Sequence, residues 1–95
     1  MLGGAGNARP LKSREAAIVL KEKELVEHEL GKTFTVYEPV IIKVQVVNGQ
    51  NFLVKILVDN EEYIHIKMHV PYDYNTNGGA SLIFVKTGKT LDDKL

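Results

Sequence analysis

The stretch Gln45-Val46-Val47-Asn48-Gly49 lies between two long runs of strand-forming residues and predicts the turn of a β-hairpin. Asn-Gly favours a type I′ turn, in which both central residues take a positive φ. Val46 and Val47 are neighbours in an extended strand, so their side chains point to opposite faces at the tip. Two interpretations follow. Neighbouring side chains cover the valines, as in an ordinary hairpin, or the rigid apolar tip docks into a partner.

The strand before this tip is expected to alternate between an apolar and a polar face from residue 34 onward. The residues expected on the apolar face are Phe34, Val36, Val40, Ile42, Val44 and Val46. Glu38 interrupts that face, and Pro39 cannot donate a hydrogen bond to a neighbouring strand. We therefore expect a bulge or bend at this point.

The chain after the tip repeats the alternation. The expected apolar positions are Phe52, Val54, Ile56 and Val58, then Ile64, Ile66, Met68 and Val70, with a turn at Asp59-Asn60-Glu61 between the two runs. Pro71 ends the third strand, residues 72–81 form a long loop, and Leu82 to Val85 form the last strand. Four strands in this order predict an antiparallel meander.

Residues 12–31 contain no proline and many good helix formers, so they predict one amphipathic helix. Ser13 is the expected N-cap and Gly31 the expected stop. The apolar stripe comprises Ala16, Ile18, Val19, Val26 and Leu30. The predicted fold is α+β: one N-terminal helix packed across a twisted antiparallel sheet of four to five strands, in a single domain over residues 1–95.

Residues 1–10 are rich in glycine, and we expect them to form a flexible N-terminal arm. The segment has no apolar core flanked by basic residues and is not typical of a signal peptide. The chain has no cysteine and no apolar run of membrane-spanning length, so we expect a cytoplasmic protein without a membrane partner.

Nucleic acid is not an expected partner, because twelve basic and twelve acidic side chains cancel. Tyr63, Tyr72 and Tyr74 are expected to be exposed and could stack on bases, but no basic groove accompanies them. His65 and His69 are four strand residues apart, roughly 13 Å, which is too far to share a metal ion. These two and His28 are expected at the surface. No catalytic constellation, metal site or cofactor is predicted, so the protein is not expected to be an enzyme.

The residues around the tip are similar to a known family. The chain resembles the stefins, the type-1 cystatins, which inhibit papain-like cysteine proteases. Gln45-Val46-Val47-Asn48-Gly49 looks like their Gln-Val-Val-Ala-Gly loop, with Asn48 in place of Ala. Gly3-Gly4 lies at the stefin spacing from this loop, and Asn51-Phe52 and the segment from Tyr63 to Lys67 are similar to stefin strands.

The resemblance implies a cystatin-like fold and a reversible, tight-binding inhibitor of papain-like proteases such as cathepsins L, B, H and S. A wedge of the N-terminal arm and two hairpin loops would fill the protease cleft. By position, Leu2 would enter an apolar pocket, and Gly3 and Gly4 would let the backbone pass close to the enzyme. Val46, Val47, Asn48 and Gly49 would press on the cleft, with Gln45 supporting the turn. Stefins also exchange domains by opening the first hairpin. The resemblance therefore implies a monomer, with a domain-swapped dimer as the alternative state.

The second loop departs from the stefin pattern. Val70-Pro71 is the best match for the usual Leu-Pro pair but comes about two residues early, and the segment from Tyr72 to Ala80 is longer than usual. Tyr72 or Tyr74 takes over the contact with the protease, or the longer loop stays in solvent without a contact. A cystatin-fold interaction module without inhibitory activity is the alternative function, since fold alone does not fix function.

Overall fold

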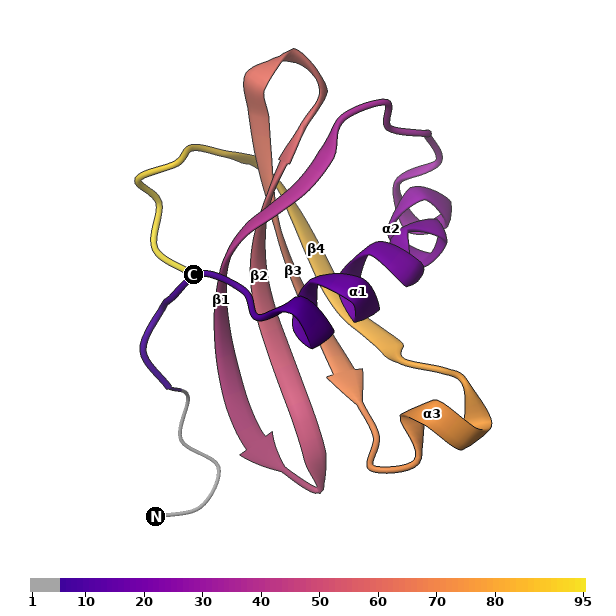
Figure 1. Cartoon of the computed structure of the whole chain (residues 1–95). Coiled ribbons are helices and arrows are strands. Elements are labelled where there is room, and N and C mark those ends of the chain that lie inside the picture. The colour runs from indigo at the N-terminus through magenta and orange to yellow at the C-terminus, as the bar shows by residue number, and fades with distance from the viewer. Residues whose placement is uncertain (1–5) are drawn as a thin grey trace.

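The computed structural model describes residues 6–95, without the side chain of Asn77. The elements in chain order are α1 (Ser13–Lys21), α2 (Lys23–Leu30), β1 (Tyr37–Val47), β2 (Gly49–Val58), the short 3-10 helix η1 (Asp59–Glu61), β3 (Glu62–Val70), α3 (Tyr74–Asn77) and β4 (Ser81–Lys89). The strands form one antiparallel sheet in the order β1-β2-β3-β4. Helices α1 and α2 cross one face of this sheet (Figure 1), so the predicted α+β architecture is confirmed.

The helical segment is interrupted, and the prediction of one continuous helix over residues 12–31 is wrong. Glu22 has φ −92° and ψ 16° and ends α1, and it also precedes the first residue of α2. The two helices point in different directions (Figure 1), which lets a short helical segment follow the twist of the sheet. Gly31 ends α2 in the left-handed conformation, as predicted.

The N-terminus of α1 is capped differently from the prediction. Lys12, and not Ser13, occupies the N-cap position. The Glu15 carboxylate accepts a hydrogen bond from the Lys12 backbone N–H at 2.8 Å and two from the Arg9 guanidinium, at 2.8 and 2.7 Å. The Arg9 bonds are the main reason that the pKa of Glu15 lies below its ordinary value. One buried carboxylate thus joins the chain before α1 to the helix.

The predicted irregularity in β1 is confirmed. The register with β2 shifts between Pro39 and Ile41, so Val40 is the extra residue of a bulge. A bulge reverses which side chains face the core, and for this reason Tyr37 is buried before it while Val36 is exposed. The prediction that Val36 belongs to the apolar face is therefore wrong, because it carried one alternation through the bulge.

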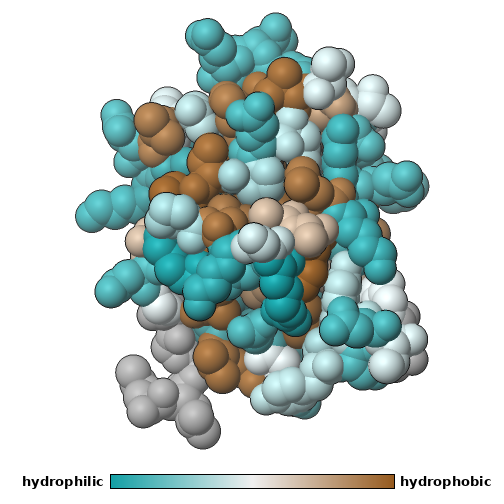
Figure 2. All heavy atoms as spheres, in the orientation of Figure 1, coloured by the Kyte–Doolittle hydropathy of each residue, from teal (hydrophilic) through white to brown (hydrophobic). Residues whose placement is uncertain are grey.

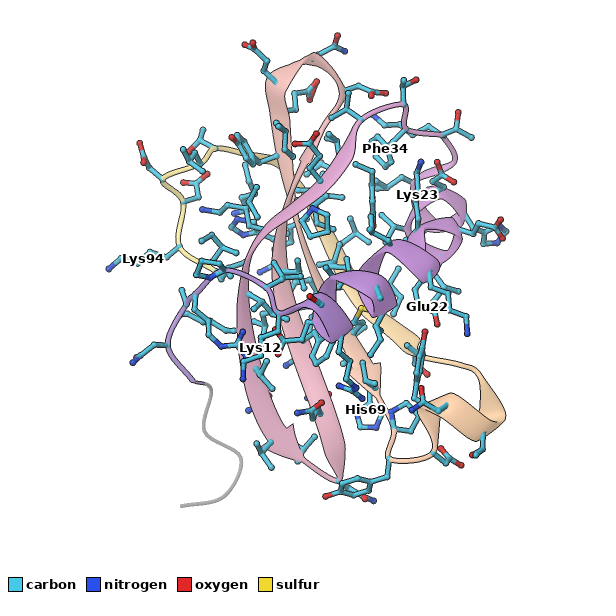
Figure 3. The ribbon with its side chains drawn as sticks, viewed as in Figure 1. Lys12, Glu22, Lys23, Phe34, His69 and Lys94 are labelled. Carbon is cyan, nitrogen blue, oxygen red and sulfur yellow. The ribbon has the colours of Figure 1, made fainter. Side chains whose placement is uncertain are left out.

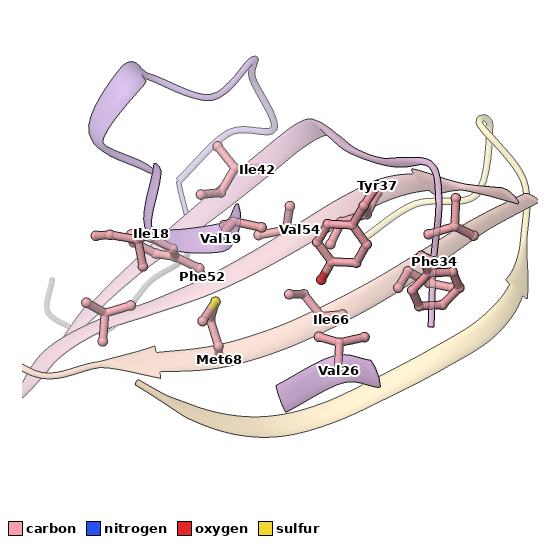
Figure 4. Close-up of a cluster of buried hydrophobic side chains, with 14 of the residues drawn as sticks. Ile18, Val19, Val26, Phe34, Tyr37, Ile42, Phe52, Val54, Ile66 and Met68 are labelled. Carbon is pink, nitrogen blue, oxygen red and sulfur yellow. The ribbon is translucent and has the colours of Figure 1, made fainter. Parts of the chain in front are cut away.

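The core lies between the helices and the sheet. Ile18, Val19 and Val26 of the helices meet Ile42, Phe52, Val54, Ile66 and Met68 of the strands (Figure 4). Phe52, Val54 and Ile56 have no accessible surface. Each such side chain contributes about 1.5–3 kcal/mol by leaving water. The predicted inward positions of the second and third strands are all buried.

The chain after β3 is more ordered than predicted. The expected loop of residues 72–81 contains α3, and the last strand extends over Ser81–Lys89 instead of residues 82–85. Tyr74 is buried at 4% exposure, so the prediction that it is exposed is wrong. It fills space beside α1, a role that strand periodicity cannot reveal.

The outer face of the sheet is also partly covered. Lys55 donates hydrogen bonds to the backbone carbonyls of Leu91 and Asp93, so the C-terminal residues lie against this face. His65, the strand partner of Lys55, is 4% exposed, and the prediction of a surface histidine is wrong. Burial, followed by the charge of Lys55, lowers the pKa of His65. His28 is exposed as predicted.

We predict that Glu15→Gln lowers the free energy of unfolding at neutral pH by about 1–2 kcal/mol, because it removes a charge-assisted interaction with Arg9. The folded-state pKa of Glu15 is depressed, so this stabilisation is complete above the ordinary value of 4.5 and disappears as the pH falls through the folded value. Urea denaturation at several pH values measures both effects. Glu29→Gln on the exposed end of α2 is the control, with a change within about 0.5 kcal/mol. Equal losses in both variants at neutral pH would contradict the prediction.

Candidate functional site

The β1–β2 turn and the end of β3 lie at the same end of the sheet. Val46 pairs with Gln50 across the hairpin, and Gln50 pairs with Val70 on the other side. The antiparallel register therefore brings residues 46–49 next to residues 70–72, which are 20 or more positions away in the chain. Figure 1 shows α3 at the same end.

The turn of the first hairpin is tighter than predicted. Val47 pairs with Gly49, so Asn48 alone lies outside the ladder. Gly49 has φ +93°, whereas Asn48 is not among the residues with positive φ. The type I′ turn and the positive φ expected for Asn48 are therefore both wrong. Strand pairing continues up to Val47 and Gly49, so only one residue is left for the turn.

Gly49 makes the closest approach between the two loops. A Cβ atom at this position would lie 2.6 Å from the carbonyl oxygen of Val70 and 3.1 Å from Cα of Pro71. Real Cβ atoms do not come so close, and a positive φ already disfavours a side chain. The glycine is required because β3 ends directly against the turn.

A row of polar side chains supports this end from the outer face. Asn51 Nδ2 donates to Gln45 Oε1 at 3.2 Å, and His69 Nδ1 lies 2.9 Å from Asn51 Oδ1. Each pair consists of direct cross-strand partners, so the row links β1, β2 and β3. Figure 3 shows His69 near the end of the sheet that carries the turn. The row fixes the splay of the three strands just before the loops.

The apolar side chains at this end are left in solvent. Val46 is 52% exposed and Tyr72 is 79% exposed, while Val47 is half-buried. The Tyr72 hydroxyl donates to the backbone carbonyl of Val47 at 3.3 Å, which ties the second loop to the first. In Figure 2, hydrophobic residues reach the surface over the lower end of the hairpin. The structure thus favours the exposed tip over the interpretation in which neighbours cover the valines.

The chain before α1 runs beside β1 toward this end. Arg9 and Ile42 exchange backbone hydrogen bonds of 3.0 and 2.8 Å, and the N–H of Gly6 donates to Val44 at 2.8 Å. The pairing is antiparallel, so the chain approaches the hairpin tip as it is followed back from Arg9 to Gly6. The part of the expected flexible arm that the structure describes is therefore joined to the sheet edge. Leu2, Gly3 and Gly4 lie outside the described residues.

No family model matches the chain. Curated proteins do match, over nearly its whole length. It is 35% identical to cystatin-A1 of Sus scrofa over 95 residues, which cover 100% of this chain and 91% of that protein. It is 32% identical to cystatin-A of Felis catus over 93 residues (98% and 94%) and 30% identical to leukocyte cysteine proteinase inhibitor 1 of Sus scrofa over 95 residues (100% and 91%). The chain belongs to the stefin family of cysteine protease inhibitors.

Two of the three edges that the stefin resemblance assigns to the wedge are described, and they lie side by side. The resemblance assigns Val46, Val47 and Gly49 to one edge, and Val70 and Tyr72 to the other. Pro71 lies between the members of the second edge, against Gly49. The sequence-based choice of Gln45 as a support for the turn agrees with its bond to Asn51.

Sequence reasoning names Tyr74 as an alternative to Tyr72 for the second contact, and its burial at 4% exposure shows that choice to be wrong. It does not single out Asn51 or His69 as parts of this site. Asn51 and His69 occupy the same outward row as Gln45, so the predicted register could have identified them. Tyr74 donates its hydroxyl to Glu22 Oε2 at 2.8 Å across 52 positions of the chain, and no local pattern reveals such a contact.

The site is a convex edge and not a pocket. A hollow of about 670 Å³ lies elsewhere, between residues 6–8, the outer face of β1 and β2, and the C-terminal residues 92–95. Within residues 6–95, no group of three or more His, Cys, Asp or Glu side chains could hold a metal ion. No helix of that part of the chain is long and apolar enough to cross a membrane.

We predict that Gly49→Ala lowers the free energy of unfolding by at least about 2 kcal/mol, because the new methyl group collides with the Val70 carbonyl at a strained φ. Gly31→Ala is the matched control, since Gly31 also has a positive φ but nothing within 4 Å of an added Cβ. The control should lose only about 1 kcal/mol. Chemical denaturation measures both, and equal losses would show that the two loops are not in close contact.

Proposed function

We propose that the protein is a reversible, tight-binding inhibitor of papain-like cysteine proteases of the cathepsin type, and that it acts as a binding protein and not as an enzyme. Membership of the stefin family supports the class of partner. In this proposal the wedge closes the active-site cleft by contact and offers no scissile bond to the catalytic thiolate. No cofactor, nucleic acid or membrane takes part.

The observation that carries the proposal is the exposure of apolar side chains on a rigid end of the sheet. Leaving Val46 and Tyr72 in water gives up burial energy that a partner's cleft would supply. The tight contact of Gly49 with residues 70 and 71 holds the two loops in place before binding. A pre-organised edge loses little conformational entropy on docking, which permits tight binding by a small surface.

Each edge has a proposed role. Val46 and Val47 press on one wall of the cleft, and Asn48 and Gly49 form the tip between them. Pro71 and Tyr72 contact the neighbouring wall, with Tyr72 in place of the usual stefin contact. Val70, expected at this edge from the resemblance, is 2% exposed and supports the two residues from the core. Leu2 enters an apolar pocket of the protease, and Gly3 and Gly4 let the backbone pass close to the enzyme.

The monomer is the proposed active form. Opening the first hairpin, as a domain swap requires, would remove the turn at Asn48 and Gly49 that forms the tip. Cathepsins are the proposed targets, and the cytoplasmic location implied by the family resemblance stays a prediction.

We predict that papain and a cathepsin L-type protease lose activity stoichiometrically when titrated with the protein. Val46→Asp should raise the papain Kd at least 30-fold, because about 2 kcal/mol is lost when a charge replaces an apolar anchor. Leu91→Asp is the control, since Leu91 is 55% exposed and follows the end of β4 that pairs with Tyr63, opposite the end of the sheet that carries the tip, and the Kd of this variant should not change. If micromolar wild-type protein left both proteases fully active, the inhibitor proposal would fail and the non-inhibitory interaction module would replace it.

We predict that deletion of Met1 to Gly4 weakens papain binding mainly by dissociation. The koff should rise about tenfold while kon stays within about threefold, because the two loops still dock and only the arm contact is lost. Stopped-flow association and displacement assays measure the two rates. The thermal midpoint should not move, since the described hydrogen bonds to β1 begin at Gly6. An unchanged koff would show that the arm takes no part in binding.

A further inference from the structure

The segment Tyr72–Ala80, here called the α3 loop, is attached to the helical segment through Tyr74. Tyr74 is 4% exposed, and its hydroxyl donates to Glu22 Oε2 at 2.8 Å. Glu22 is the residue that interrupts the helical segment between α1 and α2. Figure 3 shows its side chain on the side of the molecule that faces the α3 loop.

The Tyr74 ring is enclosed as well as hydrogen-bonded. The ammonium group of Lys21 lies 5.1 Å from the ring centroid, and a hollow of about 290 Å³ beside the ring is lined by Ala17 and Ile18 of α1. Burial and the bond to Glu22 raise the pKa of Tyr74 to about 12, so the hydroxyl stays protonated and donates throughout the physiological range.

The α3 loop is also ordered internally. The N–H of Tyr74 donates to Pro71, that of Thr76 to Asp73 and that of Gly78 to Tyr74, at 3.1, 3.0 and 2.7 Å. Two hydrogen bonds attach the loop to the rest of the protein. The Tyr72 hydroxyl donates to the Val47 carbonyl, and the Tyr74 hydroxyl donates to Glu22. The first attachment is exposed and weak, whereas the second is partly buried and is made by a buried tyrosine.

We propose that Glu22 and Tyr74 are positioning residues for the second edge of the wedge: their partly buried hydrogen bond holds the α3 loop so that Tyr72 is presented to the protease in a fixed orientation. The inference rests on the proposed function for its binding consequence. The helix interruption places Glu22 at the end of α1, from which its side chain reaches Tyr74.

A loop held in this way favours some partners over others. Held by these bonds, the α3 loop adds bulk beside Tyr72, and a protease must have room for it along the rim of its cleft. Glu22 and Tyr74 act through Tyr72 and do not themselves need to contact the enzyme.

The first test uses the free protein. In Tyr74→Phe and Glu22→Gln, hydrogen exchange of the backbone amides in residues 72–80 should accelerate at least tenfold, while amides of β2 and β3 keep their rates. Tyr63→Phe, at the opposite end of β3, is the matched control for loss of a tyrosine hydroxyl. If the exchange of residues 72–80 did not change, the proposal would be overturned, whatever the protein inhibits.

The second test uses papain and a double-mutant cycle. Tyr74→Phe should raise koff about fivefold in the wild-type background, with kon nearly unchanged. In the Tyr72→Ala background, from which the presented side chain is missing, Tyr74→Phe should have no further effect. Equal effects in both backgrounds would indicate a merely structural role and overturn the proposal. Failure of the wild-type protein to inhibit papain would instead refute the proposed function, and the exchange measurement would still decide the order of the loop.

Discussion

The close approach of Gly49 to the Val70 carbonyl is the constraint on which the working end of the molecule depends. A hydrogen atom in place of a side chain allows β3 to end directly against the β1–β2 turn. Two loops that are remote in sequence are therefore in direct contact, and each carries an exposed apolar side chain, Val46 on the first and Tyr72 on the second. The outer row of Gln45, Asn51 and His69 holds the three strands below it.

The rest of the fold keeps this end in place. The helices cover one face of the sheet and bury Phe52, Val54 and Ile66 beneath them. The chain before α1 pairs with β1, and the Arg9–Glu15 interaction joins that pairing to the helix. The C-terminal residues lie on the outer face against Lys55. Both sheet faces are therefore partly covered, while the end that carries the turn remains open.

Much of the fold could be predicted from the sequence, because strand alternation is a strong local signal. The inward positions from Phe52 to Val70 follow from the alternation of apolar and polar residues along a strand. The bulge after Pro39 follows from the missing N–H of proline. The helix interruption at Glu22 could not be predicted, since the residues on both sides are good helix formers. Tertiary packing against a twisted sheet decides that break, and propensity cannot detect it.

The candidate site was predictable in its position and less so in its construction. The Asn-Gly pair indicates a hairpin tip, but it does not reveal that Val47 pairs with Gly49 and leaves only Asn48 outside the ladder, or that the end of β3 lies against Gly49. Tyr74 and His65 are both expected at the surface, and His65 is so because it lies on the polar face of its strand. Each is buried by a distant part of the chain, α1 for Tyr74 and the C-terminal residues for His65. Long-range contacts of this kind leave no local pattern.

The central claim is that the protein binds a protease by the end of the sheet that carries both loops. An amide chemical-shift map of the ¹⁵N-labelled protein, titrated with papain whose catalytic cysteine has been alkylated by a small reagent, tests it most directly. The account predicts that the largest shifts fall in residues 1–6, 45–50 and 70–76 and that the amides of β2 beyond Phe52 move little. Large shifts confined to the exposed faces of α1 and α2, or to the outer face around Lys86 and Lys89, would contradict it.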